Sequence, residues 1–283
     1  MNITRRTFIN RTSMATTCMA LSPSLISAGG VSSRLGQIGI ILGTVKDDMK
    51  KDYRTTLLKL KEIGYKYVEG GVYGDSTEEY RQLLKEIGLK PLCTGSGMYP
   101  LQEDPDKFIR EAGALGVEYL VCYYPWVVAS SKITHELSLE AADNLNKIGK
   151  RCKEAGLKFA WHNHNWEFTD LPDGDKPFDI IMKNTDADYV SVQMDLYWVV
   201  KGGCDPVDYF KKYPGRTPLV HVKDMDNTPE KAIACVGNGI IDFKRILSHA
   251  DTGGIKHCII EHEKNTDGIS CAEVGYNHLK SII

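Results

Sequence analysis

Four polar side chains stand at the ends of short apolar runs in the second half of the chain: His162, Asp195, His221 and Glu261. Strands that are buried on both faces should be apolar, so a titratable residue at a strand end needs a chemical reason. Imidazole nitrogens and carboxylate oxygens bind Mn, Zn, Co or Fe, whereas Ca prefers oxygen ligands alone. We therefore predict one divalent metal ion held by these residues, provided that the fold brings them together.

Other titratable residues lie near these ends in the sequence. His164 and Glu167 lie just past the run that ends at His162, and they either support the ligands, contact substrate or are solvated loop residues. Lys223 either directs positive charge at a substrate oxygen or is a surface lysine. Glu69 either contacts substrate or is a solvated strand end.

Aromatic residues follow two of the apolar runs. Trp198 comes three residues after Asp195, and Tyr124 lies at the end of another run, next to Tyr123 and close to Trp126. An aromatic face can stack on a sugar ring, so Trp198 and Tyr124 are candidate substrate contacts. Ordinary packing at the end of a strand is the alternative.

Short β-rich runs alternate with amphipathic segments from Gly36 onward, as in an α/β protein. Eight strands are expected at residues 38–42, 67–69, 89–94, 117–124, 157–162, 189–195, 218–222 and 258–261. Helices are expected up to residue 63 and at residues 77–87, 105–115, 137–155 and 271–282. Strands separated by helices pair in parallel, and eight such units close into a (β/α)8 TIM barrel.

A barrel of this kind would bring the four strand ends to one mouth, however far apart they lie in the sequence. An open doubly wound sheet is the alternative fold. No G-x-G-x-x-G motif follows the first strand, so the usual dinucleotide site of that fold is missing.

The bulk composition fits a single domain. The chain has 283 residues, of which 42% are hydrophobic, and a barrel of this type needs about 250 residues. The 35 basic and 37 acidic residues nearly cancel, and the basic ones are scattered. Nucleic acid is therefore not an expected partner.

The first 30 residues differ from the rest of the chain. Residues 4–9 form a twin-arginine pattern, residues 14–26 are mildly apolar, and small residues follow at 27–30. These features predict an export signal over 1–30 and a periplasmic or exported barrel over 31–283. The segment is too short and polar for a stable membrane anchor, and a disordered tail is the alternative.

The cysteines show no paired spacing. Removing Cys18 with the signal leaves seven of the eight, an odd number, and Cys93, Cys122 and Cys258 fall in apolar runs. The pattern does not indicate a disulfide framework.

These strand ends, together with Val236–Phe243, resemble the xylose isomerase-like TIM barrel superfamily of sugar isomerases and epimerases, which also has an AP endonuclease branch. The resemblance covers almost the whole chain after residue 30. It implies a Glu, Asp, His, Glu metal set at positions 162, 195, 221 and 261. His162 departs from that set, so the resemblance leaves Glu261 as the one glutamate for acid–base work. His164, Glu167 and Glu263 are the candidates for the second proton transfer.

The resemblance implies a metal-dependent sugar isomerase or epimerase that transfers a proton next to a carbonyl of a small carbohydrate. A lyase or hydratase acting on a 3-keto sugar is the first alternative, and a non-catalytic carbohydrate-binding barrel is the second. The nuclease branch is disfavoured by Trp198, which stands where that branch carries a histidine. The residues leave the sugar, the metal and the oligomeric state open.

Overall fold

The computed structural model describes residue 35 and residues 37–127, 132–263 and 267–283. The predicted export segment lies outside these residues. Eight parallel strands form a closed barrel in the order β1-β10-β7-β6-β5-β4-β3-β2, which confirms the predicted α/β TIM barrel. The strands are β1 (Ile38–Ile41), β2 (Tyr67–Glu69), β3 (Lys90–Gly97), β4 (Tyr119–Tyr124), β5 (Lys158–His162), β6 (Ser191–Asp195), β7 (Leu219–Val222) and β10 (His257–Ile260).

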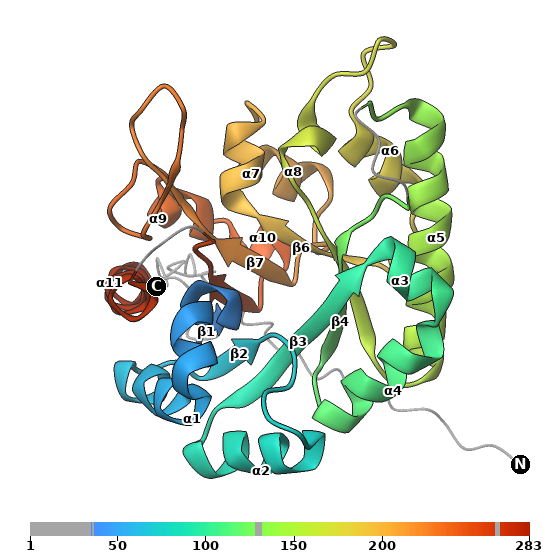
Figure 1. Ribbon diagram of the computed structural model, residues 1–283. Helices are drawn as coiled ribbons and strands as arrows, with labels where there is room; N and C mark the ends of the chain where they lie inside the picture. Colours follow the sequence, from blue (N-terminus) through green and yellow to red (C-terminus); the bar gives the residue numbers. More distant parts are fainter. Residues whose placement is uncertain (1–34, 36, 128–131, 264–266) are drawn as a thin grey trace, which may run out of the picture.

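Helices surround the strands (Figure 1). The longer ones are α1 (Lys46–Ile63), α2 (Thr77–Ile87), α4 (Pro105–Leu115), α5 (His135–Glu154), α6 (Pro177–Asn184) and α11 (Gly268–Ile282). The shorter ones are η1 (Leu42–Val45), α3 (Met98–Glu103), η2 (Asn165–Phe168), α7 (Leu196–Lys201), α8 (Pro206–Lys212), α9 (Phe243–Leu247) and α10 (Ala250–Gly253). A two-stranded antiparallel hairpin, β8 (Asp224–Met225) with β9 (Ile233–Ala234), follows β7.

The helix ends follow local sequence signals. Ser76 and Asp104 accept hydrogen bonds from backbone N–H groups in the first turns of α2 and α4. Gly88 and Gly116 end these helices with φ of 80° and 79°, a left-handed conformation that costs glycine little. The predicted bounds of α2 and α4 are confirmed.

Strand β3 is longer than predicted. It continues past residue 94 and pairs with β4 as far as Gly97 and Tyr124. A Cβ atom on Gly95 would lie 2.0 Å from the carbonyl oxygen of Val121, so only glycine fits this strand pairing. Residues 95–97 lie beyond the predicted strand, and their pairing with β4 extends the strand over them.

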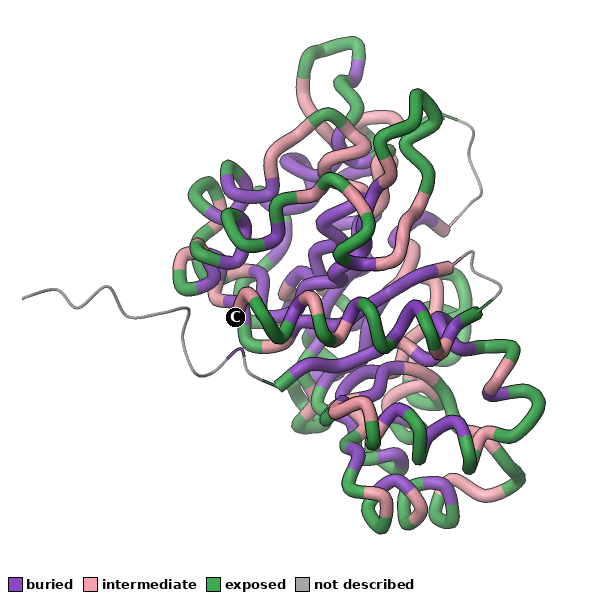
Figure 2. Tube along the Cα trace, turned by 90° about the vertical axis from the view of Figure 1, so that its left-hand side faces the viewer, coloured by how far each residue is buried: buried purple, intermediate pink, exposed green. Residues whose placement is uncertain are grey.

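The apolar core has two parts. One lies inside the barrel and contains Leu92, Cys93, Tyr119, Val121, Ala160, Leu219 and Ile259. The larger one joins other strand residues to the inner faces of the helices. Figure 2 shows buried stretches through the strands and alternating buried and exposed stretches along the helices. No helix of the described chain is long and apolar enough to cross a membrane.

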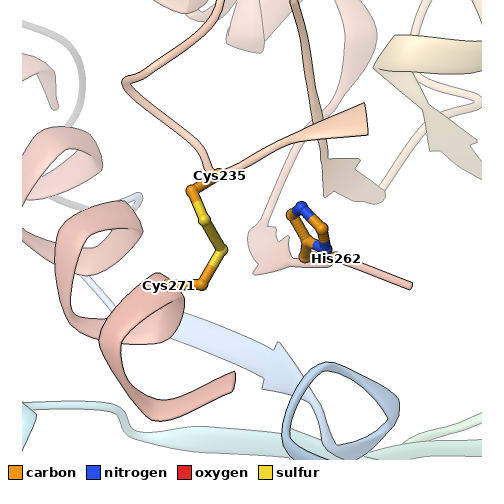
Figure 3. A group of neighbouring side chains, drawn as sticks. All are labelled: Cys235, His262 and Cys271. Atoms are coloured by element: carbon orange, nitrogen blue, oxygen red, sulfur yellow. A yellow bond between two sulfur atoms is a disulfide. The ribbon is translucent and has the colours of Figure 1, made fainter. Parts of the chain in front are cut away.

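The cysteine spacing does not indicate a disulfide framework, but the described residues contain one disulfide, which the spacing missed. Cys235, just after β9, is bonded to Cys271 in α11, 36 positions further along the sequence. His262 lies beside this disulfide (Figure 3). Folding brings the two cysteines together because the β8–β9 hairpin packs near the closing helix, which local spacing does not reveal. As disulfide partners, the two sulfur atoms offer no thiolate for a metal.

Candidate active site at the barrel mouth

The polar site lies directly above the apolar filling of the barrel. Side chains two positions apart on a strand share a face, so each strand continues the interior column begun by an apolar residue. Ala160 precedes His162, Leu219 precedes His221, and Ile259 precedes Glu261 in this way. The interior therefore changes from apolar to polar at the C-terminal ends of the strands, where barrel enzymes place their active sites.

The structure brings together the four predicted metal ligands. His162, Asp195, His221 and Glu261 each offer one ligand atom, and these atoms lie within 4.8 Å of one another. All four residues are buried. The barrel topology brings these residues together although His162 and Glu261 are 99 positions apart in the sequence.

Gln193, in the middle of β6, orients His162. The amide Nε2 of Gln193 donates to Glu69 at 2.8 Å, so its Oε1 is the atom that faces His162 Nδ1 at 3.2 Å. The Nδ1 atom must then carry the hydrogen, which leaves the lone pair on Nε2. Burial and then repulsion from His221 hold the pKa of His162 well below its usual value, so the ring is neutral.

The lone pair of His162 Nε2 faces a second acceptor, Asp195 Oδ2, at 3.7 Å. That oxygen is buried, and its charge is met by the ammonium group of Lys223 at 2.9 Å and not by the His162 ring. The His162 nitrogen and the Asp195 oxygen face each other with no hydrogen between them, so a cation placed between them could bind both. The donor types and this geometry both fit a divalent metal.

His221 lies between two glutamates. Its Nδ1 is 2.7 Å from Glu261 Oε2, and its Nε2 is 3.1 Å from Glu69 Oε2. Burial disfavours its charge, but the carboxylates of Glu69 and Glu261 outweigh that effect and raise the pKa of His221 to about 10. His221 is therefore an imidazolium here, and it must lose a proton before it can bind a metal.

Lys223 carries a second buried positive charge into the same cluster. Its Nζ lies 2.9 Å from both Asp195 Oδ2 and Glu261 Oε2, and 2.5 Å from Glu263 Oε1. Burial opposes its charge, but these carboxylates raise the pKa of Lys223 above its usual value. Lys223 is therefore not a surface lysine, which was one of its two alternatives. Its contact with a substrate oxygen stays a prediction.

Burial alone would raise the pKa of Glu261, but Lys223 and His221 outweigh it and hold this pKa well below its usual value. Glu261 is thus ionised, as a base must be. It lines a cavity of about 160 Å³ at the mouth, together with Ile41, Tyr123, His162, His164, His221 and Glu263.

Two of the other acid–base candidates take different places. His164 lines the mouth cavity, and burial followed by the charge of Lys223 lowers its pKa to about 4. Glu167 is fully buried and accepts a hydrogen bond from the backbone N–H of His164 at 2.9 Å, as part of a capping box at η2. Burial raises the pKa of Glu167 to about 8. Its carboxyl group is not part of the mouth cavity lining.

None of the four predicted substrate contacts, Glu69, Trp198, Lys223 and Tyr124, is among the residues that line this cavity. Glu69 lies under His221 and is fully buried, not a solvated strand end. The ring of Trp198 lies 5.1 Å from Lys223 Nζ and 5.6 Å from the His164 ring. Tyr124 lies 6.4 Å from the His164 ring and lines a separate, larger pocket. Their contact with substrate stays a prediction.

Two functional positions were missed from sequence. Gln193 had a signal, since an amide inside a buried strand is unusual. Asp224 is the other: its carboxylate accepts backbone hydrogen bonds from Gly237, Gly239 and Ile241. It thereby fixes the loop that carries the Val236–Phe243 motif, next to the hairpin that follows His221.

Comparisons with known proteins agree with this architecture. Residues 57–281 match the family described as the xylose isomerase-like TIM barrel. An inosose dehydratase from Clostridium beijerinckii is 23% identical over 217 residues, which cover 70% of this chain and 66% of that protein. The chain therefore matches slightly less than two thirds of that relative's length.

Two solved structures share the fold. A sugar phosphate isomerase/epimerase from Parabacteroides distasonis is 22% identical, with a TM-score of 0.73 and coverage of 92% of this chain and 98% of that one. The IolI protein with a bound zinc atom is 16% identical, with a TM-score of 0.68 and coverage of 87% and 97%. Because the family match extends over most of the chain, this protein belongs to the xylose isomerase-like TIM barrel family.

Proposed function

We propose that this protein is a metal-dependent enzyme that removes a proton next to the carbonyl of a keto-sugar and completes the reaction by elimination. The observation that carries the proposal is the joint burial of His162, Asp195, His221 and an ionised Glu261 around one point of the mouth. The similarity to an inosose dehydratase supports elimination, and the similarity to IolI with zinc supports a divalent metal.

The chain's own residues would share the work as follows. Glu261 takes the proton from the carbon beside the carbonyl, and a carbon–carbon double bond forms as the bond from the next carbon to its oxygen substituent breaks. The electron pair leaves with that oxygen, which receives the proton back from Glu261. When bound, a metal ion would polarise the carbonyl oxygen and favour loss of the neighbouring proton.

Elimination suits a site with a single glutamate in the metal set. One carboxyl group can carry the same proton from carbon to the leaving oxygen, whereas epimerisation needs a proton acceptor and a donor on opposite faces of the carbon. The second glutamate of the family pattern is replaced by His162. A metal-bound His162 has no lone pair left for proton transfer.

Isomerisation or epimerisation is the second candidate, and His164 is the observation that favours it. Its neutral ring lines the same cavity as Glu261 and offers a second proton acceptor. The similarity to a sugar phosphate isomerase/epimerase points in the same direction.

We also propose that the twin-arginine pattern exports the protein, which the disulfide between Cys235 and Cys271 supports. Fusion of residues 1–30 to a reporter, with Arg5 and Arg6 changed to lysine as the control, tests this. Equal export of both fusions would refute the proposal.

One experiment separates the enzyme classes. The metal-loaded protein is incubated in D2O with free ketoses and with 3-keto glycosides, and products are followed by NMR. Release of the substituent with formation of an unsaturated ketone supports elimination, and deuterium uptake at the carbon beside the carbonyl without release supports epimerisation. Glu261→Gln should abolish turnover, whereas Glu118→Gln, on the chain just before β4, should retain it. Binding of sugars without exchange or turnover would show a binding protein.

A further inference from the structure

A second, larger pocket opens beside the mouth cavity. It has a volume of about 580 Å³, within the range of small-molecule sites. It is formed by the end of β4, by Lys132 and Ile133 before α5, and by the chain from η2 to the start of α6, all at the same end of the barrel as the site. Its lining includes Tyr124, Ile133, Trp166, Leu171, Pro172 and Pro177. None of these residues is used by the proton transfer described above.

His164 is the boundary between the two spaces. Its ring lines the mouth cavity, and on the other side it stacks on Trp166 with 5.5 Å between ring centroids and 27° between planes. Tyr124 lies edge-on to both His164 and Trp166, at 6.4 Å in each case. His164, which lines the mouth cavity, is thus in ring contact with two residues that line the larger pocket.

The lining of the larger pocket differs in character from the mouth. The mouth cavity is surrounded by charged and imidazole side chains, whereas the larger pocket is mainly aliphatic and aromatic. Trp166 is 50% exposed, an unusual exposure for the largest apolar side chain. Asp170, also in the lining, is paired with Lys176 at 2.6 Å and so does not present an isolated charge.

We propose that this pocket binds an aromatic aglycone, so that the substrate is an aryl glycoside of a keto-sugar and not a free monosaccharide. The inference rests on the proposed elimination, because the leaving oxygen would then belong to the aglycone. In that reaction Glu261 moves the proton from the carbon beside the carbonyl to the glycosidic oxygen, the bond from that oxygen to the sugar breaks, and the products are an unsaturated keto-sugar and a free phenol. Aromatic stacking on Trp166 and burial against the aliphatic lining supply the recognition.

Binding measurements test the pocket independently of turnover. Dissociation constants are measured by calorimetry for matched phenyl and methyl glycosides of several keto-sugars and of the parent sugars. We expect at least one phenyl glycoside to bind about tenfold more tightly than its methyl partner. Trp166→Ala should bring this ratio close to one, and Trp166→Phe, which keeps an aromatic ring, should retain most of it.

Leu58→Ala is the matched control, because Leu58 is an exposed apolar residue of α1, outside the pocket lining, and its loss should leave the ratio unchanged. The inference is overturned if no phenyl glycoside in the panel binds more tightly than its methyl partner, or if Trp166→Ala leaves the preference intact. A phenyl preference without turnover of any substrate would instead remove the proposed elimination and keep the aromatic pocket.

Discussion

Lys223 and Glu261 form a buried ion pair at the centre of the barrel mouth, with 2.9 Å between Nζ and Oε2. The lysine side chain is fully buried and lies at the same distance from Asp195. An ammonium group thus neutralises the two carboxylates that belong to the predicted metal set. Lysine and metal ion therefore act on the same negative charge, and their effects on stability and metal affinity should be linked.

We predict that Lys223→Met destabilises the metal-free protein by about 3–5 kcal/mol, because it leaves buried carboxylates uncompensated. With saturating metal the loss should be smaller, and metal affinity should rise because a competing cation is gone. Urea unfolding with a chelator and with added Zn measures both effects. Lys147→Met is the control, since Lys147 forms an exposed pair worth at most about 1 kcal/mol. Equal losses with and without metal would contradict the linkage.

We predict one bound divalent metal per chain, and weakening of its binding by at least about tenfold in His162→Gln and in Asp195→Asn. Elemental analysis gives the stoichiometry, and competition with a chelator gives the affinity. If His162→Gln binds metal as tightly as the wild type, His162 is not a ligand. The three remaining positions would then form the site.

The apparent metal affinity should rise with pH. His221 has its pKa raised to about 10 and must release a proton to coordinate, so protons compete with the metal below that pH. Titration between about pH 6 and 9 in two buffers of different ionisation enthalpy would measure the released proton. An affinity that does not change with pH would show that His221 stays charged and outside the coordination sphere.

Glu167 should make the protein less stable as pH rises. Burial raises its pKa in the folded protein from 4.5 to about 8, so between these values the folded state holds a proton that the unfolded state has lost. The free energy of unfolding then falls by up to about 1.4 kcal/mol per pH unit across this window, and the contribution is fully present only below about pH 4.5.

Glu167→Gln keeps a side-chain oxygen for the N–H of His164 and removes the titration. Its stability relative to the wild type should therefore increase from about pH 5 to about pH 8. Denaturant unfolding at a series of pH values measures the difference. Parallel pH profiles for the two proteins would show that Glu167 is not the titrating group.

Reduction of the disulfide should lower stability. The bond between Cys235 and Cys271 closes a segment of 36 positions, and cross-links of this size typically contribute about 2–4 kcal/mol. Thermal unfolding with and without a thiol reductant should differ for the wild type and coincide for the Cys235→Ser, Cys271→Ser double variant. A wild-type curve that does not respond to reductant, with two extra reactive thiols in the native protein, would show that the bond does not form.

The sequence by itself determined the strands, the helices that end at glycine, and the set of polar strand ends. These are local properties: residue periodicity selects each element, and glycine tolerates the left-handed turn at Gly88 and Gly116. Parallel strands then place His162, Asp195, His221 and Glu261 at one mouth by topology alone.

The tertiary structure decided how these groups are charged and joined. The neutral state of His162, the imidazolium of His221 and the buried ammonium of Lys223 depend on which carboxylates lie within 4 Å and on how deeply the groups are buried. The disulfide and the pocket beside Trp166 likewise depend on segments that meet only after folding. Sequence spacing carries no information on such through-space contacts, because electrostatic energy depends on distance and burial and not on position along the chain.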